Sequence, residues 1–568
     1  MLSQIGELLE LRGENRFKAR AYRVAAQAVL GVQADDLAPM YRDGSLAGLA
    51  GVGPATMSVL GELVETGESA FFDRLRESTP EGLVEMMRVP GLGTAKIHQI
   101  HEEIGVTSLD ELERAARDGS LATIKGIGPK TAERILKGIS QLRATGDYAL
   151  FPQARVEAQR LLAAVAAHPD VVRAAIAGSV RRRSEIVRDI DIVAACTGAP
   201  SAAAASFANS PGVRDAIGVG SRSVSIRFVD GTMLDLHCVE PEHFGVALWR
   251  ATGSAGHERA VRELAATRGL TIDGDELRDA SGASVIALDE AALYAALGLG
   301  YIEPELREGD GEIAAAARHA LPALVSLTDV QGVLHCHSQY SDGKATIAEM
   351  AAAAKARGWS YLGVSDHSQS AFYAGGLSVA QVLEQHDEID RVNASMRDFR
   401  VLKGIEADIL PDGQIDYDAA LLDRFDYVIG SVHSRFGMDE RAMTDRVLHA
   451  LDDPHLTILG HPTGRLLLTR EPYRIDLEAV LRKAAERGVA VELNADPRRL
   501  DLDWRWCRTA KELGVSIEIG PDAHSIISLD YVEIGVGIAR KGWLEAGDVL
   551  NTRSADEVLA HARARRSA

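Results

Sequence analysis

The last third of the chain alternates short apolar runs with longer, helix-like stretches. The runs occupy residues 361–364, 401–402, 427–429, 457–459 and 515–517. Helix-like stretches such as 347–357 and 477–487 separate them. Short runs rich in Val, Ile and Leu that alternate with helices are typical of repeated βα units, so the pattern predicts a parallel α/β domain.

A second alternating pattern lies nearer the middle of the chain, over residues 187–193. Asp189 and Asp191 alternate there with apolar side chains, so both carboxylates project from one face of a predicted strand. Asp235 supplies a third acid from another alternating run. Adjacent carboxylates repel each other unless a cation lies between them, and Mg²⁺ is the natural occupant. The alternative is an exposed pair on an edge strand, which the third acid disfavours.

The first 146 residues contain one pattern three times: an apolar residue, a variable residue, glycine, an apolar residue and glycine, followed by an apolar helix. The glycine pairs are Gly51 and Gly53, Gly91 and Gly93, and Gly126 and Gly128. Such a turn directs its amides outward, where they can bind a phosphate without a charged side chain. A single turn is more often a plain helix connector, but three in register favour nucleic-acid binding.

Composition and charge limit the classes of function. A chain of 568 residues is too long for one core, so several domains are expected. The net charge of −20 taken alone argues against a nucleic-acid partner, but binding depends on local patches and backbone amides. The four cysteines show no CxxC spacing, which fits a reducing cytoplasm. A signal-peptide pattern and long apolar runs are both absent, so we expect a cytoplasmic protein that does not enter the membrane.

Histidine and acidic residues follow the apolar runs of the last third. The candidate metal ligands are His335, His337, Asp342, His367, Glu406, His433, His461, Asp522 and His524. In βα barrels, chemistry lies at the C-terminal strand ends, and histidines at i and i+2 share one face of a strand. Any single histidine, such as His449 or His455, is more simply an ordinary surface or core residue. Nitrogen and oxygen ligands from many segments in fixed order instead predict a multinuclear metallohydrolase.

The motifs HCHS at 335–338, SDG at 341–343, SDH at 365–367, GSVH at 430–433, GHP at 460–462 and DAH at 522–524 resemble those of the PHP (polymerase and histidinol phosphatase) family. The resemblance covers about 330–568 and implies a distorted seven-stranded βα barrel with up to three divalent ions, commonly Mn²⁺ or Zn²⁺. It implies that Glu406 bridges two ions, and that Asp366 orients His367. The other implied ligand sets are His335, His337 and Asp522; His433 and His461; and Asp342, His367 and His524.

A Gly-Ser turn at 178–179 and the three middle acids resemble the nucleotidyltransferase superfamily, and the segment WRATGS at 249–254 extends the likeness to family X DNA polymerases. The resemblance implies an α+β palm that performs two-metal phosphoryl transfer. Asp189 and Asp191 would bind both metal ions, and Asp235 would assist removal of the primer 3′-hydroxyl proton. The implied nucleotide contacts are Gly178, Ser179, Arg182, Thr252 and Gly253.

The three glycine turns resemble helix-hairpin-helix DNA-binding motifs, and the basic stretch 15–26 is similar to the first helix of the small N-terminal domain of DNA polymerase beta. Solvated Arg and Lys on an ordinary helix are the alternative for that stretch. Val59 stands where relatives with lyase activity have a Schiff-base lysine, so this chemistry is not expected there. Arg250 replaces a frequent aromatic residue, and Glu258 replaces a frequent Asn, where a carboxylate could repel DNA.

The sequence therefore predicts a helical helix-hairpin-helix region at 1–146, an α+β palm and thumb at 147–310, a linker at 311–329 and an α/β barrel at 330–568. We expect a monomeric bacterial repair enzyme that adds deoxynucleotides to gapped, nicked or primer-template DNA with Mg²⁺. The barrel would act on 3′ ends or abasic sites with Mn²⁺ or Zn²⁺. The alternatives are a repair nuclease with a degenerate polymerase site, a small-molecule phosphatase, and a structural DNA-binding protein whose acid clusters are empty.

Overall fold

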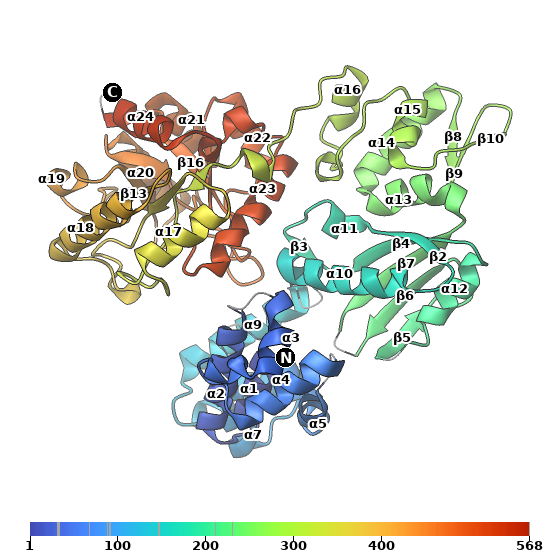
Figure 1. The fold of residues 1–568 in the computed structure, drawn as a ribbon, viewed down its shortest axis with the longest axis horizontal. Coiled ribbons are helices and arrows are strands. Elements are labelled where there is room, and N and C mark those ends of the chain that lie inside the picture. Colours follow the sequence, from blue (N-terminus) through green and yellow to red (C-terminus); the bar gives the residue numbers. More distant parts are fainter. Residues whose placement is uncertain are drawn as a thin grey trace. The chain divides into compact units, whose positions relative to one another are not determined.

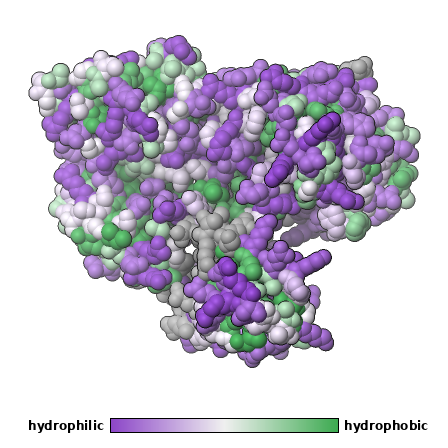
Figure 2. Space-filling model, turned by 180° about the vertical axis from the view of Figure 1, so that it is seen from behind, coloured by the Kyte–Doolittle hydropathy of each residue, from purple (hydrophilic) through white to green (hydrophobic). Residues whose placement is uncertain are grey.

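The computed structural model describes residues 1–30, 34–66, 69–87, 89, 92–145, 148–210, 212–229 and 231–566. The chain divides into two compact units, Met1–Asp147 and Tyr148–Ala568 (Figure 1). Within the described residues, no helix is long and apolar enough to cross a membrane. Hydrophilic residues cover most of the face shown in Figure 2, and hydrophobic residues lie in small patches between them.

The first unit is helical, as predicted. Its helices are α1 (Leu2–Leu11), α2 (Arg16–Leu30), α3 (Ala34–Asp43), α4 (Pro54–Thr66), α5 (Ala70–Glu77), α6 (Glu81–Met86), α7 (Thr94–Ile104), α8 (Leu109–Arg117) and α9 (Pro129–Thr145). The apolar faces of α1, α2, α4 and α5 bury Ile5 and Tyr22 in one core. Those of α7, α8 and α9 bury Ile97, Leu112 and Ile135 in a second core.

The second unit begins with a five-stranded sheet of order β2-β4-β7-β6-β5. Its strands are β2 (Val171–Ile176), β4 (Ile190–Cys196), β5 (Val213–Ile217), β6 (Ser223–Phe228) and β7 (Met233–Val239). β4 and β7 are parallel, and the other pairs are antiparallel. α10 (Phe151–Ala166) packs on Ile190 and Ile192, whereas α13 (Phe244–Thr252) packs on Val193 and Ala195, so helices cover both faces.

A smaller core follows the sheet. It is built from α13, α14 (Ala255–Thr267), the three-stranded sheet of β8 (Thr271–Asp273), β9 (Glu276–Arg278) and β10 (Ser284–Val285), and α15 (Glu290–Ala296). Trp249 and Tyr294 are fully buried in it. The segment expected to be a linker contains α16 (Glu312–Ala317), whose Ala316 packs into this core.

The last region is the predicted seven-stranded parallel barrel. Its strands follow in chain order: β11 (Gly332–Val333), β12 (Tyr361–Val364), β13 (Arg400–Asp408), β14 (Tyr427–Ser431), β15 (Leu456–Leu459), β16 (Ala490–Asn494) and β17 (Ile517–Gly520). His337 N donates to Ala523 O at 2.9 Å, which joins the segments after the first and last strands. The strands are buried on both faces because helices surround them, and this explains their continuous apolar runs.

The helices of the barrel are α17 (Ile347–Ala356), α18 (Val379–Ser395), α19 (Ala419–Leu422), α20 (Glu440–Asp452), α21 (Leu477–Arg487), α22 (Trp504–Glu512), α23 (Tyr531–Lys541) and α24 (Ala555–Arg566). The last two residues of α23, Arg540 and Lys541, form ion pairs with the segment before α16. Arg540 Nε lies 2.8 Å from Glu305 Oε1, and the buried Lys541 ammonium binds Glu308. Ion pairs thus attach the barrel to the smaller core of the same unit.

Candidate active sites

The candidate metal ligands of the barrel lie at the C-terminal ends of its strands. They are His335 and His337 with Asp342 after β11, His367 after β12, Glu406 on β13, His433 after β14, His461 after β15, and Asp522 and His524 after β17. Parallel strands place these ends on one rim, so ligands distant in sequence converge. His335, His337, Glu406 and His461 are each at most 1% exposed.

Glu406 lies centrally in this cluster, and its two oxygens face different histidines. Oε1 lies 3.0 Å from His461 Nε2 and 3.2 Å from His433 Nε2. Oε2 lies 2.9 Å from His367 Nδ1 and 3.4 Å from His335 Nε2. Burial opposes ionisation, but His433, His335 and His367 hold the pKa of Glu406 well below its usual range. Glu406 is therefore a carboxylate that can face two cations.

Three sets of side chains have ligand atoms within 4.8 Å of one another among the described residues. They are His335, His337 and Asp522; His367, Glu406 and His433; and His337, Asp342, His367 and His524. This grouping differs from the one that the sequence suggested, because His337 and His367 each belong to two sets. His461 lies outside these sets and contacts the cluster through Glu406.

Several buried atoms of the cluster make no hydrogen bond of acceptable geometry. They are His335 Nε2, both ring nitrogens of His337, His367 Nδ1, Glu406 Oε2 and His461 Nδ1. An unsatisfied buried polar atom costs about 1–3 kcal/mol, so a group of them needs an external partner. Burial, His524 and His367 lower the pKa of His337 to about 3, which keeps this imidazole neutral and able to bind metal. These residues fit a site for divalent cations.

The three palm acids come from the adjacent parallel strands β4 and β7. Asp191 on β4 is the register partner of Asp235 on β7, and Asp189 lies immediately before β4. Burial, followed by repulsion from Asp189 and Asp235, raises the pKa of Asp191 to about 7. Burial and Asp235 also raise the pKa of Asp189. Carboxylates that oppose one another's ionisation in this way favour a cation between them.

The turn at Gly178 and Ser179 lies against these acids. Gly178 has a φ of +59°, and a Cβ there would overlap the Asp191 carboxylate, so glycine is required. The Ser179 hydroxyl is buried and makes no hydrogen bond within the described structure. A buried hydroxyl beside an acidic cluster fits a ligand that brings its own hydrogen-bonding atoms, such as a phosphate.

Arg182 is held between several residues of the second unit. It donates to the Thr252 carbonyl, and a Cβ on Gly253 would lie 3.3 Å from Arg182 Nη1, so these three expected nucleotide contacts are neighbours. Arg182 Nε also lies 3.1 Å from Glu308 Oε1. The Lys541 ammonium at the end of α23 donates to the Arg182 carbonyl at 3.1 Å and binds Glu308 as well. Lys541 of the barrel therefore contacts Arg182 of the palm, which is expected to bind the nucleotide.

The hairpin turns of the first unit share one geometry. The amides of Val52, Leu92 and Ile127 donate to the carbonyls of Leu49, Val89 and Ile124 at 3.0–3.1 Å. Gly51 and Gly126 have φ of +77° and +89°, while Gly91 lies outside the described residues. α4, α7 and α9 begin directly after the second glycine of each turn. In the first turn, Gly53 N donates to Thr56 Oγ1 at 2.7 Å, so that amide is already bonded.

Known proteins match the chain along its length. The family descriptions are helix-hairpin-helix domain at 1–69, SAM-like helix-hairpin-helix tandem at 83–141, DNA polymerase beta thumb at 247–308 and PHP domain at 334–496. The DNA polymerase/3′-5′ exonuclease PolX of Bacillus subtilis (strain 168) is 36% identical over 563 residues, which cover 99% of this chain and 98% of that protein. The chain belongs to the bacterial family X DNA polymerases with a PHP domain.

Shorter relatives of this family X polymerase match a segment about the length of its barrel. A probable phosphatase of Thermoanaerobacter sp. (strain X514) is 28% identical over 236 residues, 38% of this chain and 89% of the relative. A probable phosphatase of Caldanaerobacter subterraneus subsp. tengcongensis is 28% identical over 239 residues, 39% of this chain and 86% of the relative. The near-complete match to PolX distinguishes the chain from a free-standing phosphatase.

The three positions expected to depart from the family pattern, Val59, Arg250 and Glu258, contact other residues of this chain. Arg250 Nη2 lies 2.8 Å from Asp275 Oδ1. Glu258 Oε1 lies 2.8 Å from Arg262 Nη2, one helical turn along α14, so this pair reduces the repulsion of DNA that Glu258 suggests. Val59 is 2% exposed and packs in the first core of the helical unit.

Sequence reasoning missed the acids that orient the barrel ligands. The fully buried Glu492 on β16 accepts a hydrogen bond from His335 Nδ1 at 2.6 Å, and Asp408 accepts one from His433 Nδ1 at 2.7 Å. Such bonds direct the other ring nitrogen, Nε2, toward the cluster. The available signal was a charged residue inside the apolar run 490–493.

Asp366 has different partners from the one expected. The side chain is fully buried and accepts hydrogen bonds from Ser338 N at 2.8 Å, Ser341 Oγ at 2.5 Å and Gln385 Nε2 at 2.6 Å. These bonds hold the loop after His337 rather than the ring of His367. Asp366 therefore supports the cluster through the backbone of the loop after β11.

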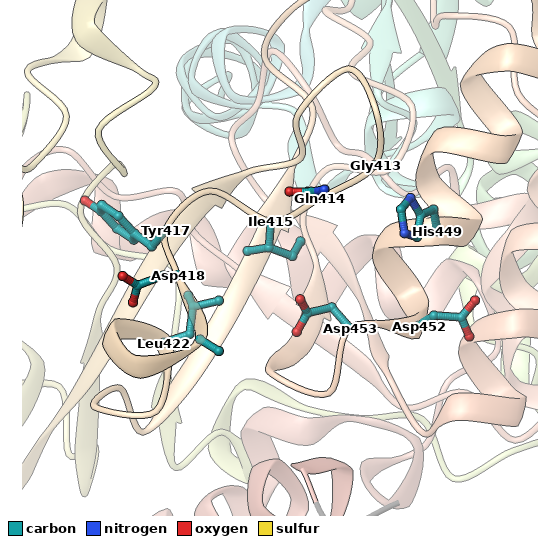
Figure 3. Close-up of a pocket in the computed structure, with 10 residues that line it drawn as sticks. Gly413, Gln414, Ile415, Tyr417, Asp418, Leu422, His449, Asp452 and Asp453 are labelled. Atoms are coloured by element: carbon teal, nitrogen blue, oxygen red, sulfur yellow. The ribbon is translucent and has the colours of Figure 1, made fainter.

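A separate pocket of about 390 Å³ lies on the barrel (Figure 3). Loop 413–418, α19 and the end of α20 line it, and Figure 3 shows the side chains of Asp418, His449, Asp452 and Asp453 around it. None of the candidate metal ligands is among the lining residues. The pocket is therefore distinct from the cluster of candidate metal ligands.

Proposed function

We propose that the chain is a DNA repair polymerase that adds deoxynucleotides to gapped, nicked or primed DNA and removes nucleotides from 3′ ends in its barrel. The Bacillus subtilis relative is named for both activities. The observation that carries the proposal is the presence of two separate ligand clusters in one chain, the palm acids and the barrel ligands. The hairpin turns supply backbone amides for the DNA phosphates.

In the palm, we assign Asp189, Asp191 and Asp235 to divalent cations, with Mg²⁺ the preferred ion. When bound, such ions neutralise the charge that develops on a transferred phosphoryl group. Ser225 Oγ donates to Asp235 and fixes the direction of its carboxylate. The Ser179 hydroxyl makes no hydrogen bond within the described structure and can donate to the triphosphate. The guanidinium of Arg182, which Glu308 also binds, would offset part of the triphosphate charge.

In the barrel, we assign the histidine and acid cluster to up to three divalent ions, Mn²⁺ or Zn²⁺. When bound, they lower the pKa of water and hold a phosphodiester. Glu406 faces histidines on both sides, and Glu492 and Asp408 fix the orientation of their imidazoles. Arg499 Nε lies 3.3 Å from Asp522 Oδ2 and adds a cation beside the cluster.

The proposal includes where and with what the enzyme works. Its substrates are DNA and deoxynucleoside triphosphates, so we propose that it acts in the bacterial cytoplasm at the nucleoid. We propose that it does so as a monomer, since both ligand clusters are built from one chain. For the domain limits we keep 1–146, 147–310, 311–329 and 330–568.

A reciprocal pair of variants tests the function. Asp191→Ala should reduce extension of a gapped duplex by more than about 100-fold, because a misplaced metal and triphosphate lose their alignment. Removal of 3′ nucleotides should persist. Glu406→Ala should strongly reduce removal of 3′ nucleotides and should leave extension unchanged. Primer extension and degradation of an end-labelled strand are measured on both variants and on wild type.

Two outcomes would contradict the assignments. Extension by Asp191→Ala within about tenfold of wild type would show that Asp191 does not hold a metal ion. Unchanged degradation by Glu406→Ala would remove the barrel cluster from the nuclease reaction. Wild-type hydrolysis of a phosphomonoester alone, without DNA degradation, would favour the phosphatase function for which the shorter relatives are named.

A further inference from the structure

Two adjacent aromatic side chains are exposed beside the barrel cluster. Phe372 and Tyr373, on the 3₁₀ turn Phe372–Ala374 that follows β12, are 85% and 62% exposed. Two neighbouring aromatic rings that stay exposed forgo a burial free energy of about 25 cal/mol for each Å² of apolar surface. Such an exposed pair therefore indicates a binding surface.

The backbone of this turn is fixed rather than extended into solvent. Ala371 N donates to Ser368 O at 3.0 Å, and Ser370 N donates to Asp416 Oδ2 at 2.8 Å. Ala371 and Ala374, which flank the two aromatic residues, are buried. The rings are thus presented on an anchored base, so little conformational entropy is lost when a ligand binds them.

The two rings lead from solvent to the metal cluster. The Tyr373 ring lies 6.4 Å from the His433 ring at an interplanar angle of 70°, and the Phe372 ring lies 6.1 Å from the Tyr373 ring at 77°. His433 Nε2 in turn lies 3.2 Å from the central carboxylate of Glu406. A base stacked on either aromatic ring could therefore belong to the same short strand as a phosphodiester held at the cluster.

We propose that Phe372 and Tyr373 form a stacking platform for the bases at the single-stranded 3′ end whose phosphodiester is hydrolysed in the barrel. The inference rests on the proposed nuclease function of the same site. Aromatic rings stack on every base, so the platform would be indifferent to sequence but would require a base and an unpaired strand. Two side chains are too small a patch for a stable protein interface, which buries about 800 Å² on each partner.

The platform predicts a preference that a purely structural turn would not produce. Loss of one stacking contact weakens single-strand binding about fivefold to a hundredfold. Phe372→Ala and Tyr373→Ala in the full chain should therefore raise KM for a single-stranded oligonucleotide by such a factor, with a smaller effect on kcat. Tyr373→Phe should retain wild-type behaviour, because stacking uses the ring and not the hydroxyl.

A base-free substrate separates stacking from damage to the cluster. The same oligonucleotide is prepared with abasic residues at its 3′ end, and the alanine variants should process it as wild type does. Val379, an exposed residue at the start of α18, provides the matched control. Val379→Ala should leave KM unchanged for both substrates. Bound metal is measured for each variant, and it should equal that of wild type.

Each contrary outcome has a distinct meaning. Equal losses on the base-bearing and abasic ends, or loss of bound metal, would show that the turn supports the cluster and would overturn the platform. An unchanged KM in both alanine variants would overturn it as well while leaving the nuclease function intact. If wild type degrades neither oligonucleotide, the proposed nuclease function fails and the platform fails with it.

Discussion

At the scale of the residue, a Cβ added to Gly178 would make a closer contact than one added to any other glycine of residues 148–310. Gly178→Ala would place a methyl group against the Asp191 carboxylate at a backbone φ of +59°. The carboxylate or the turn must then move, and we expect nucleotide addition to fall by about 100-fold or more while 3′ degradation stays unchanged. Single-turnover extension of a gapped duplex measures the loss. Gly547→Ala, where a Cβ meets open space, is the matched control.

Glu492 gives a second prediction at this scale. It holds His335 Nδ1 at 2.6 Å and binds the backbone amide of His461 at 2.5 Å. Glu492→Gln keeps the size but removes the charge, and loss of such a partner costs about 10–100-fold in metal affinity. Metal titration of the purified variant tests this, with Glu512→Gln on the exposed side of α22 as control. Wild-type metal affinity in Glu492→Gln would show that its charge is unimportant.

The convergence of the candidate barrel ligands could be predicted from sequence because most of them stand in short motifs at strand ends. Glu492 could be noticed as a charged residue inside an apolar run, but its partner and that of Asp408 could not be predicted, because those histidines lie on distant segments that only the folded barrel brings together. The Glu258–Arg262 pair lies four residues apart on one helix, so the sequence could have predicted it. The Arg250–Asp275 pair could not be predicted, because it joins α13 to the turn between β8 and β9.

At the scale of the element, the hairpin turns can be tested through their glycines. Gly126→Ala strains a turn whose φ is +89° and should tilt the amides that face the DNA phosphates. Both activities on DNA should fall severalfold, while hydrolysis of a small phosphodiester by the barrel should not change. Gly105→Ala is the matched control, because it has φ of +69° and equally open space but ends α7 outside a hairpin turn. Equal effects of the two variants would assign the loss to helix stability alone.

The barrel and the palm differed in how far their elements could be predicted. Each barrel strand pairs with the next in sequence, so the five predicted apolar runs follow one another in strand order. β11 and β16 lie outside those runs, and the number of seven strands came from the family resemblance. The palm order β2-β4-β7-β6-β5 places β7 between β4 and β6, a non-local pairing that local alternation does not encode. The sequence could place Asp191 and Asp235 near each other only because both acids lie in alternating runs.

At the scale of the whole molecule, Lys541 links the barrel to the palm within the second unit. This barrel residue shares Glu308 with Arg182, an expected nucleotide contact of the palm. Lys541→Met would leave Glu308 to Arg182 alone, so Arg182 should bind the triphosphate less well and KM for nucleotide should rise about threefold to tenfold. Steady-state extension measures this. Lys511→Met removes a cation bound only within the barrel, to Glu545 and Asp548, and should leave KM unchanged.

The ion pairs of α23 also bear on how the protein can be divided. Cutting the chain in the segment 311–329 removes Lys541 and Arg540, and so leaves Glu308 bound to Arg182 alone and separates Glu305 from Arg540. In a polymerase shortened in this way, Glu308 would compete more strongly for Arg182, the proposed triphosphate contact, and Glu305 would lose its pair with Arg540. An engineer who wants polymerisation without the nuclease should therefore keep the barrel and inactivate its cluster, or first replace both acids with glutamine.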